Sequence, residues 1–278
     1  TSADAISLIG LDTAGSGTIS ITTTNSSDAA DDITIGAALA ASAGTGALTL
    51  TANDDVNIDN ALTHAGAITL TAHGAGNATD TDAVGNIYGD SVVTATSAAL
   101  RLNAKQIDDN SDTSGTLGVL SSTLYIDANG STAAKNIGIT SADAVSLIGL
   151  DTAGSGTISI TTTHSSDTAD DITIGSALAA SAATGALTLT ANDDINIDNA
   201  LTHAGAITLT ANGAGTNAGN LYGDSVVTAT GAALRLNAKQ IDDNSDSSGN
   251  LGVISSTLYV DADASGNNNI GITSADAI

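Results

Sequence analysis

Two nearly identical acidic turns contain the residues of this sequence that are best suited to chemistry. They read QIDDNSDTSG at 106–115 and QIDDNSDSSG at 240–249. Each turn places side-chain oxygens at alternate positions: Asp108, Asn110 and Asp112 in the first, and Asp242, Asn244 and Asp246 in the second. A Ca²⁺ loop requires oxygen ligands at this spacing. The pattern therefore makes Ca²⁺ the one cofactor that the sequence suggests.

A second interpretation of these turns stays open. The Gly that a Ca²⁺ loop carries at its sixth position is replaced by Thr113 or Ser247, and no Glu follows to bind in a bidentate way. Asp and Asn also form turns readily and keep a repetitive protein soluble. The sequence favours turn formation and solubility over ion binding as the role of these residues.

Other polar groups are weaker candidates. TDTD at 79–82 is lost in the second half of the chain, and NDDVNIDN at 53–60 has three carboxylates that we expect to point partly outward. His64 and His203 occupy the same motif, NALTHAGAI, without the partners of a zinc site or a catalytic triad. We expect both histidines to lie on the surface, at a corner between two strands.

The sequence contains no catalytic pattern. Its Gly-rich pieces, such as GAGN at 74–77, lack the G-K-[ST] of a phosphate loop, and nothing resembles H-E-x-x-H or a paired-carboxylate cleft. We therefore expect a protein that is not an enzyme.

The few cations recur at fixed places. AALRLNAKQIDD contains Arg101 and Lys105, and the same motif later contains Arg235 and Lys239. One interpretation is a basic stripe that makes lateral contacts with the acidic surface of a neighbouring molecule. The other, which we favour, is a local pair with Asp108 or Asp109, and an exposed pair of this kind contributes little stability.

Composition excludes several classes of protein. The net charge is −25, which opposes binding to nucleic acid or to anionic membranes. The chain has no Cys, so it has neither disulfides nor thiolate metal sites. It has no apolar run long enough for a membrane-spanning helix and no signal-peptide pattern. We expect the sequence to be a window of a longer protein.

A long tandem repeat organises the chain. TSADAISLIGLDTAGSGTISITTT at the start returns at Thr140 with one substitution, and TSADAI begins again at Thr273. We predict a first repeat at 1–139, a second at 140–272 and the start of a third at 273–278. The second repeat is shorter mainly because NATDTDAVGN at 77–86 becomes TNAGN at 216–220.

Inside each repeat, short apolar-x-apolar segments recur between Gly, Asn, Asp and Ser. Nine such segments begin at residues 6, 19, 33, 48, 56, 68, 100, 124 and 137. Period-two alternation predicts strands, and strands this short need stacking partners. The pattern predicts an all-β parallel β-helix, or β-solenoid, with about 20–25 residues per coil and roughly 11–14 coils. A string of β-sandwich domains is the alternative, and the shortage of aromatic residues disfavours it.

GAITLTAHGAGN, GALTLTANDDVNIDNAL and GTISITTT resemble the strand repeats of filamentous haemagglutinin-type exoproteins and related giant bacterial surface adhesins. The resemblance covers essentially the whole chain. It implies a right-handed parallel β-helix and export from a bacterium. It also implies a fibrous stalk that serves adhesion, biofilm or filament formation.

Our leading hypothesis is therefore a structural, extracellular stalk segment that associates with itself or continues in a longer chain. A surface or glycan ligand is a further expected partner, whereas nucleic acid and membrane insertion are not. The alternative is a binding solenoid, either Ca²⁺-dependent or carbohydrate- or ice-binding through Thr-bearing faces such as TISITTT. Uneven coil lengths count against a flat ice-binding plane.

Overall fold

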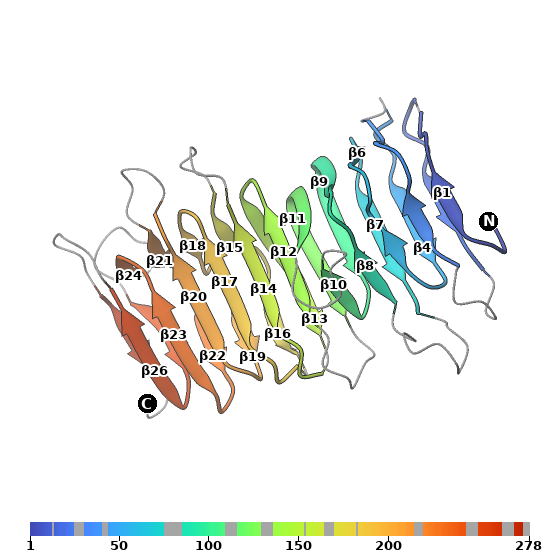
Figure 1. Ribbon diagram of the computed structural model, residues 1–278. Helices are drawn as coiled ribbons and strands as arrows, with labels where there is room; N and C mark the ends of the chain where they lie inside the picture. The colour runs from blue at the N-terminus through green and yellow to red at the C-terminus, as the bar shows by residue number, and fades with distance from the viewer. Residues whose placement is uncertain are drawn as a thin grey trace. The chain divides into compact units, whose positions relative to one another are not determined.

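The computed structural model shows an all-β protein whose parallel strands stack as a β-solenoid of about 9 turns, with about 24 residues per turn (Figure 1). The structure describes residues 1–12, 14–24, 31–40, 44–74, 85–108, 116–128, 136–152, 154–163, 170–181, 183–213, 219–242, 250–262 and 270–274. Within these ranges there is no helix, and hence none that could cross a membrane. The predicted fold class is confirmed.

The chain forms two compact units. Unit 1 comprises Thr1–Ser131 and Lys135–Ile139, and unit 2 comprises Thr132–Ala134 and Thr140–Ile278. The strands of unit 1 are β1 (Ile6–Leu8), β2 (Ile19–Thr22), β3 (Ile33–Ile35), β4 (Leu48–Ala52), β5 (Val56–Asn57), β6 (Leu62–His64), β7 (Ile68–Ala72), β8 (Asn86–Tyr88), β9 (Val92–Asn103), β10 (Gln106–Asp108), β11 (Leu117–Ala128) and most of β12 (Ile137–Ser141).

Unit 2 repeats this order. Its strands are β13 (Val145–Thr152), β14 (Ile158–Thr162), β15 (Ile172–Ile174), β16 (Leu178–Ser181), β17 (Leu187–Ala191), β18 (Ile195–Asn196), β19 (Leu201–His203), β20 (Ile207–Ala211), β21 (Asn220–Tyr222), β22 (Val226–Ala229), β23 (Ala233–Asn237), β24 (Gln240–Asp242), β25 (Leu251–Ile254), β26 (Thr257–Asp261) and β27 (Ile272–Ser274).

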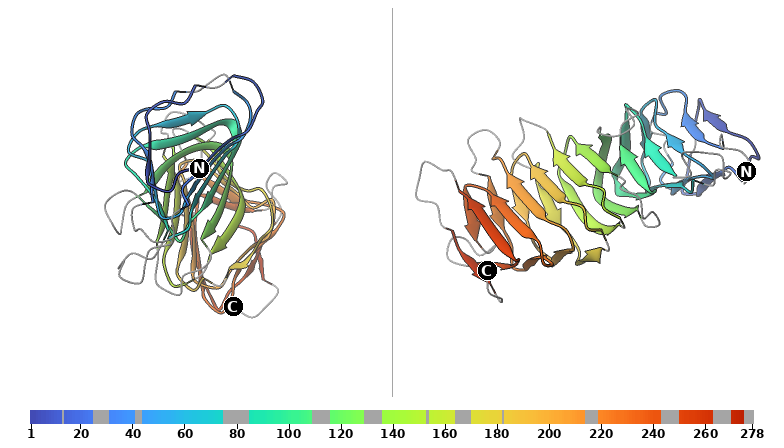
Figure 2. Two further views of the ribbon diagram at one scale, coloured as in Figure 1. Left: turned by 90° about the vertical axis from the view of Figure 1, so that its right-hand side faces the viewer. Right: turned by 60° about the horizontal axis from the view of Figure 1, so that its bottom comes forward.

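The turns of the chain build three faces (Figure 2). In unit 2, face A is the ladder β14–β17–β20–β23–β26, face B is β13–β15–β18–β21–β24, and face C is β16–β19–β22–β25–β27. Unit 1 has the same faces, with β9 and β11 each running from face C round the corner to face A. All of these pairings are parallel.

Inward side chains form the core of each unit. On face A of unit 1, Leu48 stands over Ile68 and Ile68 over Leu100, and all three are at most 1% exposed. Burying each such side chain contributes about 1.5–3 kcal/mol. Because these residues alternate with outward Thr, one strand of five residues can be buried on one side and solvated on the other.

Two close-packed glycine columns mark the corners that lead into face A. A Cβ on Gly46 would lie 2.0 Å from the backbone oxygen of Gly17, and one on Gly66 would lie 2.2 Å from that of Gly46. In unit 2, Gly185 and Gly205 meet the same obstruction at 1.9 and 2.0 Å. Glycine is therefore required at positions 46, 66, 185 and 205, because consecutive turns touch there through their backbones.

One expectation needs correction. The roughly 11–14 coils become about 9 turns, because some connections are long and add residues without adding a turn. The Ala-rich stretch at 36–48 contributes to face C where it is described: Leu39 bridges to Leu62, and its counterpart in unit 2 is β16. Among the described non-Gly residues, Ser97 has a positive φ.

Candidate functional site

Three carboxylates meet at the corner of unit 2 that leads into face B. Asp171 precedes β15, and Asp193 and Asp194 precede β18 in the next turn, where Ile172 pairs with Ile195. Carboxylate oxygens of the three residues lie within 4.8 Å of one another. Of the His and Asp groups in the described chain, this is the cluster with a geometry that fits a metal ion.

The backbone holds the two outer carboxylates in place. Asp194 N donates to Asp171 Oδ1 at 3.0 Å, and Asn220 N donates to Asp194 Oδ1 at 2.6 Å. Each carboxylate thus binds the amide of the following turn, and the column continues along the axis. This bonding fixes both groups beside Asp193.

Asp193 is the buried member of the cluster. Its side chain is 2% exposed, and its Oδ1 has no hydrogen-bond partner. Buried carboxylate oxygens are normally hydrogen-bonded or bound to a cation, because leaving one bare carries the full desolvation penalty. An unsatisfied oxygen therefore lies inside a group of like charges.

The charges of this corner perturb one another. Burial, with a smaller contribution from the charges of Asp193 and Asp171, raises the pKa of Asp194 to about 6. Burial also raises the pKa of Asp171. Tyr222, on the neighbouring β21, has its pKa raised to about 12 by burial and then by Asp194 and the adjacent carboxylates. The corner is therefore strongly anionic near neutral pH.

Face A carries the second group of candidate residues. In unit 2 its outward positions form two rows, Thr188–Thr208–Arg235–Tyr259 and Thr190–Thr210–Asn237–Asp261. The Arg235 guanidinium lies 4.0 Å from the Tyr259 ring centre, and Arg101 lies 3.7 Å from that of Tyr125. Contacts between a guanidinium and an aromatic face contribute about 0.5–1 kcal/mol at exposed sites.

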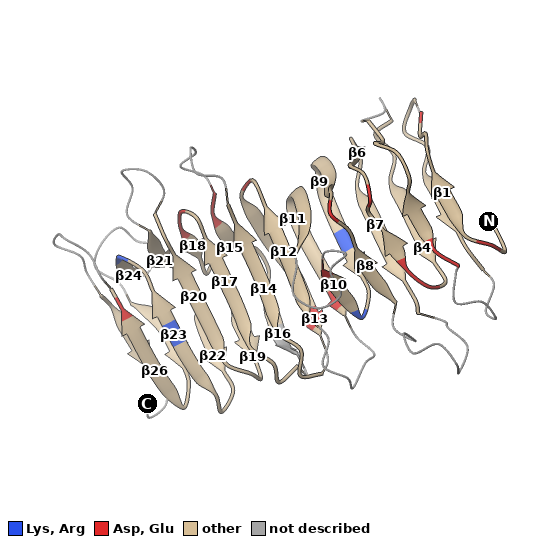
Figure 3. Cartoon of the chain, viewed as in Figure 1, with Lys and Arg blue, Asp and Glu red and all other residues tan. Residues whose placement is uncertain are grey.

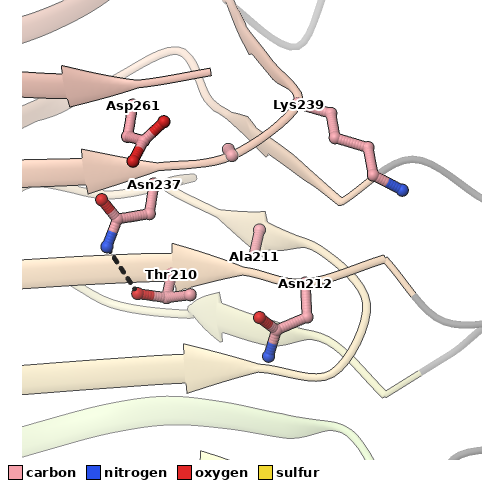
Figure 4. A pocket seen from close by; sticks show the side chains of 7 residues that line it. Thr210, Ala211, Asn212, Asn237, Lys239 and Asp261 are labelled. Carbon is pink, nitrogen blue, oxygen red and sulfur yellow. Dashed lines mark hydrogen bonds between the residues drawn. The ribbon is translucent and has the colours of Figure 1, made fainter. Parts of the chain in front are cut away.

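A shallow open hollow lies at the edge of face A in unit 2. Its lining includes Thr210, Asn237, Asp261 and Lys239 (Figure 4). Asn237 Nδ2 donates to Thr210 Oγ1 at 3.0 Å, while the Lys239 side chain extends away from these groups. The hollow is shallow and lined by polar side chains. Among the residues that line it, no nucleophile contacts a general base.

The cations predicted to make lateral contacts have distinct surroundings. Arg101 and Arg235 are exposed on face A, and Lys105 and Lys239 are half-buried just beyond it. Figure 3 shows few Lys and Arg residues in the described chain, and it shows acidic residues at strand ends and corners. The Arg–Tyr stacking is a local contact that the sequence reasoning did not identify.

The predicted Ca²⁺ turns lie mostly outside the described residues. Asn110, Asp112, Asn244 and Asp246 fall within 109–115 and 243–249, where the structure describes nothing. Asp108 and Asp242 are buried, and each accepts a short hydrogen bond from Nε2 of the Gln two residues earlier. Ca²⁺ binding at these turns stays a prediction.

The two histidines were wrongly expected at the surface. His64 and His203 are 0% and 1% exposed, and their Nε2 atoms donate to the backbone oxygens of Gly46 and Gly185 at 2.6 and 2.8 Å. They are buried because Leu62–His64 and Leu201–His203 are strands, β6 and β19, so each His points inward like the Leu two residues earlier. Burial lowers the pKa of His203.

The Asp171–Asp193–Asp194 cluster was missed as a unit, although the sequence contains a signal for it. Two Asp-Asp pairs, 170–171 and 193–194, each stand directly before an Ile and are separated by 23 residues, close to the length of one coil. Residues one coil apart stack in a parallel solenoid.

Comparisons of the chain with protein-family models, with curated proteins and with solved structures found no match.

Proposed function

We propose that this chain is a structural segment of a bacterial extracellular fibre or stalk, of the kind found in filamentous haemagglutinin-type adhesins. The observation that supports the proposal most is the in-register parallel stacking of face A. In face A of unit 2, five strands from β14 to β26 pair in sequence, and an aliphatic residue stands over an aliphatic residue at every inward position. Such a solenoid is compatible with a repetitive structural role.

The proposed mechanism is mechanical. Each turn donates backbone hydrogen bonds to the next, as in Leu187 N to Ala206 O at 2.8 Å, and the glycine columns bring the turns into direct contact. Because each turn contacts mainly its neighbours, length can be added by repeating turns without redesigning a core. Array length would then set how far the stalk reaches.

We propose self-association as the main partnership of this stalk. Turn-on-turn pairing leaves strand edges that template further strands, and a longer chain would cover them with additional turns. Laterally, the exposed Arg101 and Arg235 of face A would meet acidic corners of another copy. The net charge of −25 keeps such contacts selective, because most other surface approaches are repulsive.

Immunogold electron microscopy on intact producing cells tests the extracellular role. Antibodies raised against the chain are expected to label filaments at the cell surface without permeabilisation. Label that appears only after permeabilisation would overturn the extracellular stalk. Loss of cell attachment on deletion of the coding segment tests the adhesin role separately.

A binding role for the Thr-bearing face is the second candidate. Although coils differ in length, the T-x-T ranks are in register: Thr49 stands over Thr69, and Thr51 over Thr71. Uneven coils therefore do not disturb this face, because the extra residues lie in the connections. The following turns place Arg101 and Tyr125 in the same row, which limits the Thr surface. Thermal hysteresis of the purified chain tests ice binding, and a glycan array tests carbohydrate binding.

A further inference from the structure

We infer that Asp171, Asp193 and Asp194 form a divalent-cation site of unit 2 that selects Ca²⁺. The site is separate from the predicted turns at 108–112 and 242–246, and it does not depend on the proposed stalk function. Two observations point to it: three carboxylates that converge across two turns, and a buried oxygen among them without a hydrogen-bond partner.

The donor set of the cluster favours Ca²⁺ over Mg²⁺. Ca²⁺ binds oxygen at about 2.3–2.6 Å, so two ligands on opposite sides of the ion lie up to about 5 Å apart. The three carboxylate oxygens lie within 4.8 Å of one another, which lets one Ca²⁺ contact all of them. Mg²⁺ requires near-octahedral geometry and gives up its waters reluctantly, so a group of three protein carboxylates suits Ca²⁺ better.

The burial of Asp193 Oδ1 favours a bound ion, and not solvent, as the partner of this oxygen. Asp193 is 2% exposed, and its Oδ1 has no hydrogen-bond partner. In the next turn the corresponding corner residue is Gly219, which brings no side chain, and Lys239 lies one turn further still. A bound Ca²⁺ would coordinate this oxygen, and half-exposed Asp171 and Asp194 leave an open side for water ligands.

The outer carboxylates are already arranged for coordination. Asp171 and Asp194 each use Oδ1 to accept a backbone amide, which fixes the position of the carboxylate, and the Asn220 side chain also hydrogen-bonds Asp194. Raised pKa values for both groups, caused mainly by burial, agree with charge that is poorly neutralised in the ion-free chain. Ca²⁺ binding would favour the ionised form of both carboxyls and so lower their pKa values.

Unit 1 supplies a matched comparison. Asp32, Asp54 and Asp55 hold the equivalent positions, and Asp55 N and Asn86 N donate to them in the same way, at 3.2 and 2.7 Å. In the described part of the chain, however, the convergent three-carboxylate group forms in unit 2 alone. We therefore expect unit 2 to bind Ca²⁺ more tightly than unit 1.

Thermal unfolding of the full chain, with Ca²⁺ or with a chelator, tests the site. Saturating Ca²⁺ is expected to raise the midpoint by about 5 °C, and Mg²⁺ by less. Asp193→Asn should lower Ca²⁺ affinity by about tenfold or more, since it removes a charged ligand. It should still fold, because it also removes an unsatisfied buried charge. Asp54→Asn should preserve most of the Ca²⁺ response.

Terbium luminescence provides a second readout that separates binding from folding. Tyr222 lies beside the cluster on β21, so it should sensitise Tb³⁺ bound there, and excess Ca²⁺ should quench the signal. Tyr222→Phe should abolish most of the emission, whereas Tyr88→Phe in unit 1 should not. The inference is overturned if millimolar Ca²⁺ leaves the midpoint unchanged, or if Asp193→Asn responds to Ca²⁺ like the unmodified chain.

Discussion

Units 1 and 2 have almost the same sequence, and their few differences show which parts of a solenoid turn are constrained. The turn from Ile68 to Leu100 takes 32 residues, whereas the equivalent turn from Ile207 to Leu234 takes 27. Both nevertheless place a Leu over an Ile in register on face A. The five-residue difference is absorbed between β7 and β8 in unit 1 and between β20 and β21 in unit 2.

The glycine columns, by contrast, do not vary between units. Gly46 and Gly66 match Gly185 and Gly205, and all four lack room for a Cβ. The number of residues thus varies between β7 and β8 and between β20 and β21, whereas glycine is kept where consecutive backbones touch. This contrast predicts which changes the two units tolerate.

The largest expected effect is at the glycine columns. Gly205→Ala places a methyl group 2.0 Å from the backbone oxygen of Gly185 and should destabilise the chain by about 3 kcal/mol. Gly66→Ala should cost a similar amount in unit 1. Urea unfolding measures both, with Gly17→Ala as the control, since a Cβ there meets nothing within 4 Å. If all three variants had equal stability, close backbone contact would not be the constraint.

The next effect concerns the acidic corner of unit 2. Asp194 has a pKa of about 6 in the folded chain, above its unfolded value near 3.8, so the folded state binds more protons between these pH values. Stability in chelator should therefore fall as pH rises from about 4 to about 6. Asp194→Asn should be more stable than the unmodified chain at pH 7 by about 1 kcal/mol, after allowing for solvent screening.

Below about pH 4 this difference should vanish, because the carboxyl is then protonated in both states. Denaturation at a series of pH values measures it. Exposed Asp198 provides the control, and Asp198→Asn should leave the pH dependence unchanged. A constant difference from pH 4 to pH 7 would contradict the assignment.

A smaller effect is expected where the units place different residues at one left-handed backbone position. Ser97 in β9 has φ of 56°, and its counterpart in unit 2 is Gly231, with φ of 68°. A left-handed residue with a side chain is strained by about 1–2 kcal/mol, partly offset by the flexibility that Gly adds to the unfolded chain. Ser97→Gly should therefore stabilise unit 1 by about 0.5–1 kcal/mol, and Gly231→Ser should destabilise unit 2 by as much.

These two substitutions form a reciprocal pair, and hydrogen exchange of the flanking strands measures each unit by itself. A Cβ added to Gly231 would meet nothing within 4 Å, so steric clash does not confuse the comparison. Effects of the same sign in both units would rule out backbone strain as the cause.

The smallest effect should come from exchanging the long connection. Replacing TNAGN at 216–220 by NATDTDAVGN gives unit 2 the longer turn of unit 1. Doubling a loop costs about 0.6 kcal/mol in closure entropy, so the unfolding midpoint should hardly move. A loss of several kcal/mol would show that turn length is constrained after all.

The sequence predicted the periodic part of this fold well. Alternating Ile, Leu and Val found the strands of face A and several of face B, although not β8 or β10. The 20-residue return from Leu48 to Ile68 is one circuit, as Leu48 pairs with Ile68. It failed on face C, where Leu62–His64 and Leu178–Ser181 carry too few large apolar residues to look like strands. His64 and His203 were wrongly expected at the surface because these strands of face C were not predicted.

The candidate site was harder to predict because it is made by stacking. The sequence drew attention to the single turn 106–115, whereas the cluster joins Asp171 to residues one coil later. Knowing the coil length of each turn is necessary before side chains on different turns can be matched. Coil length varies from 20 to 32 residues on face A of unit 1, so the sequence alone does not show which side chains stack.

Single-molecule force spectroscopy of the chain, held at its two ends, tests the central claim that its stacked turns form a mechanical element. We predict distinct force peaks, with contour-length gains in multiples of one turn, about 80 Å for 24 residues. Smooth extension at low force without peaks would contradict the claim, because it would show that the register-matched ladders do not resist load.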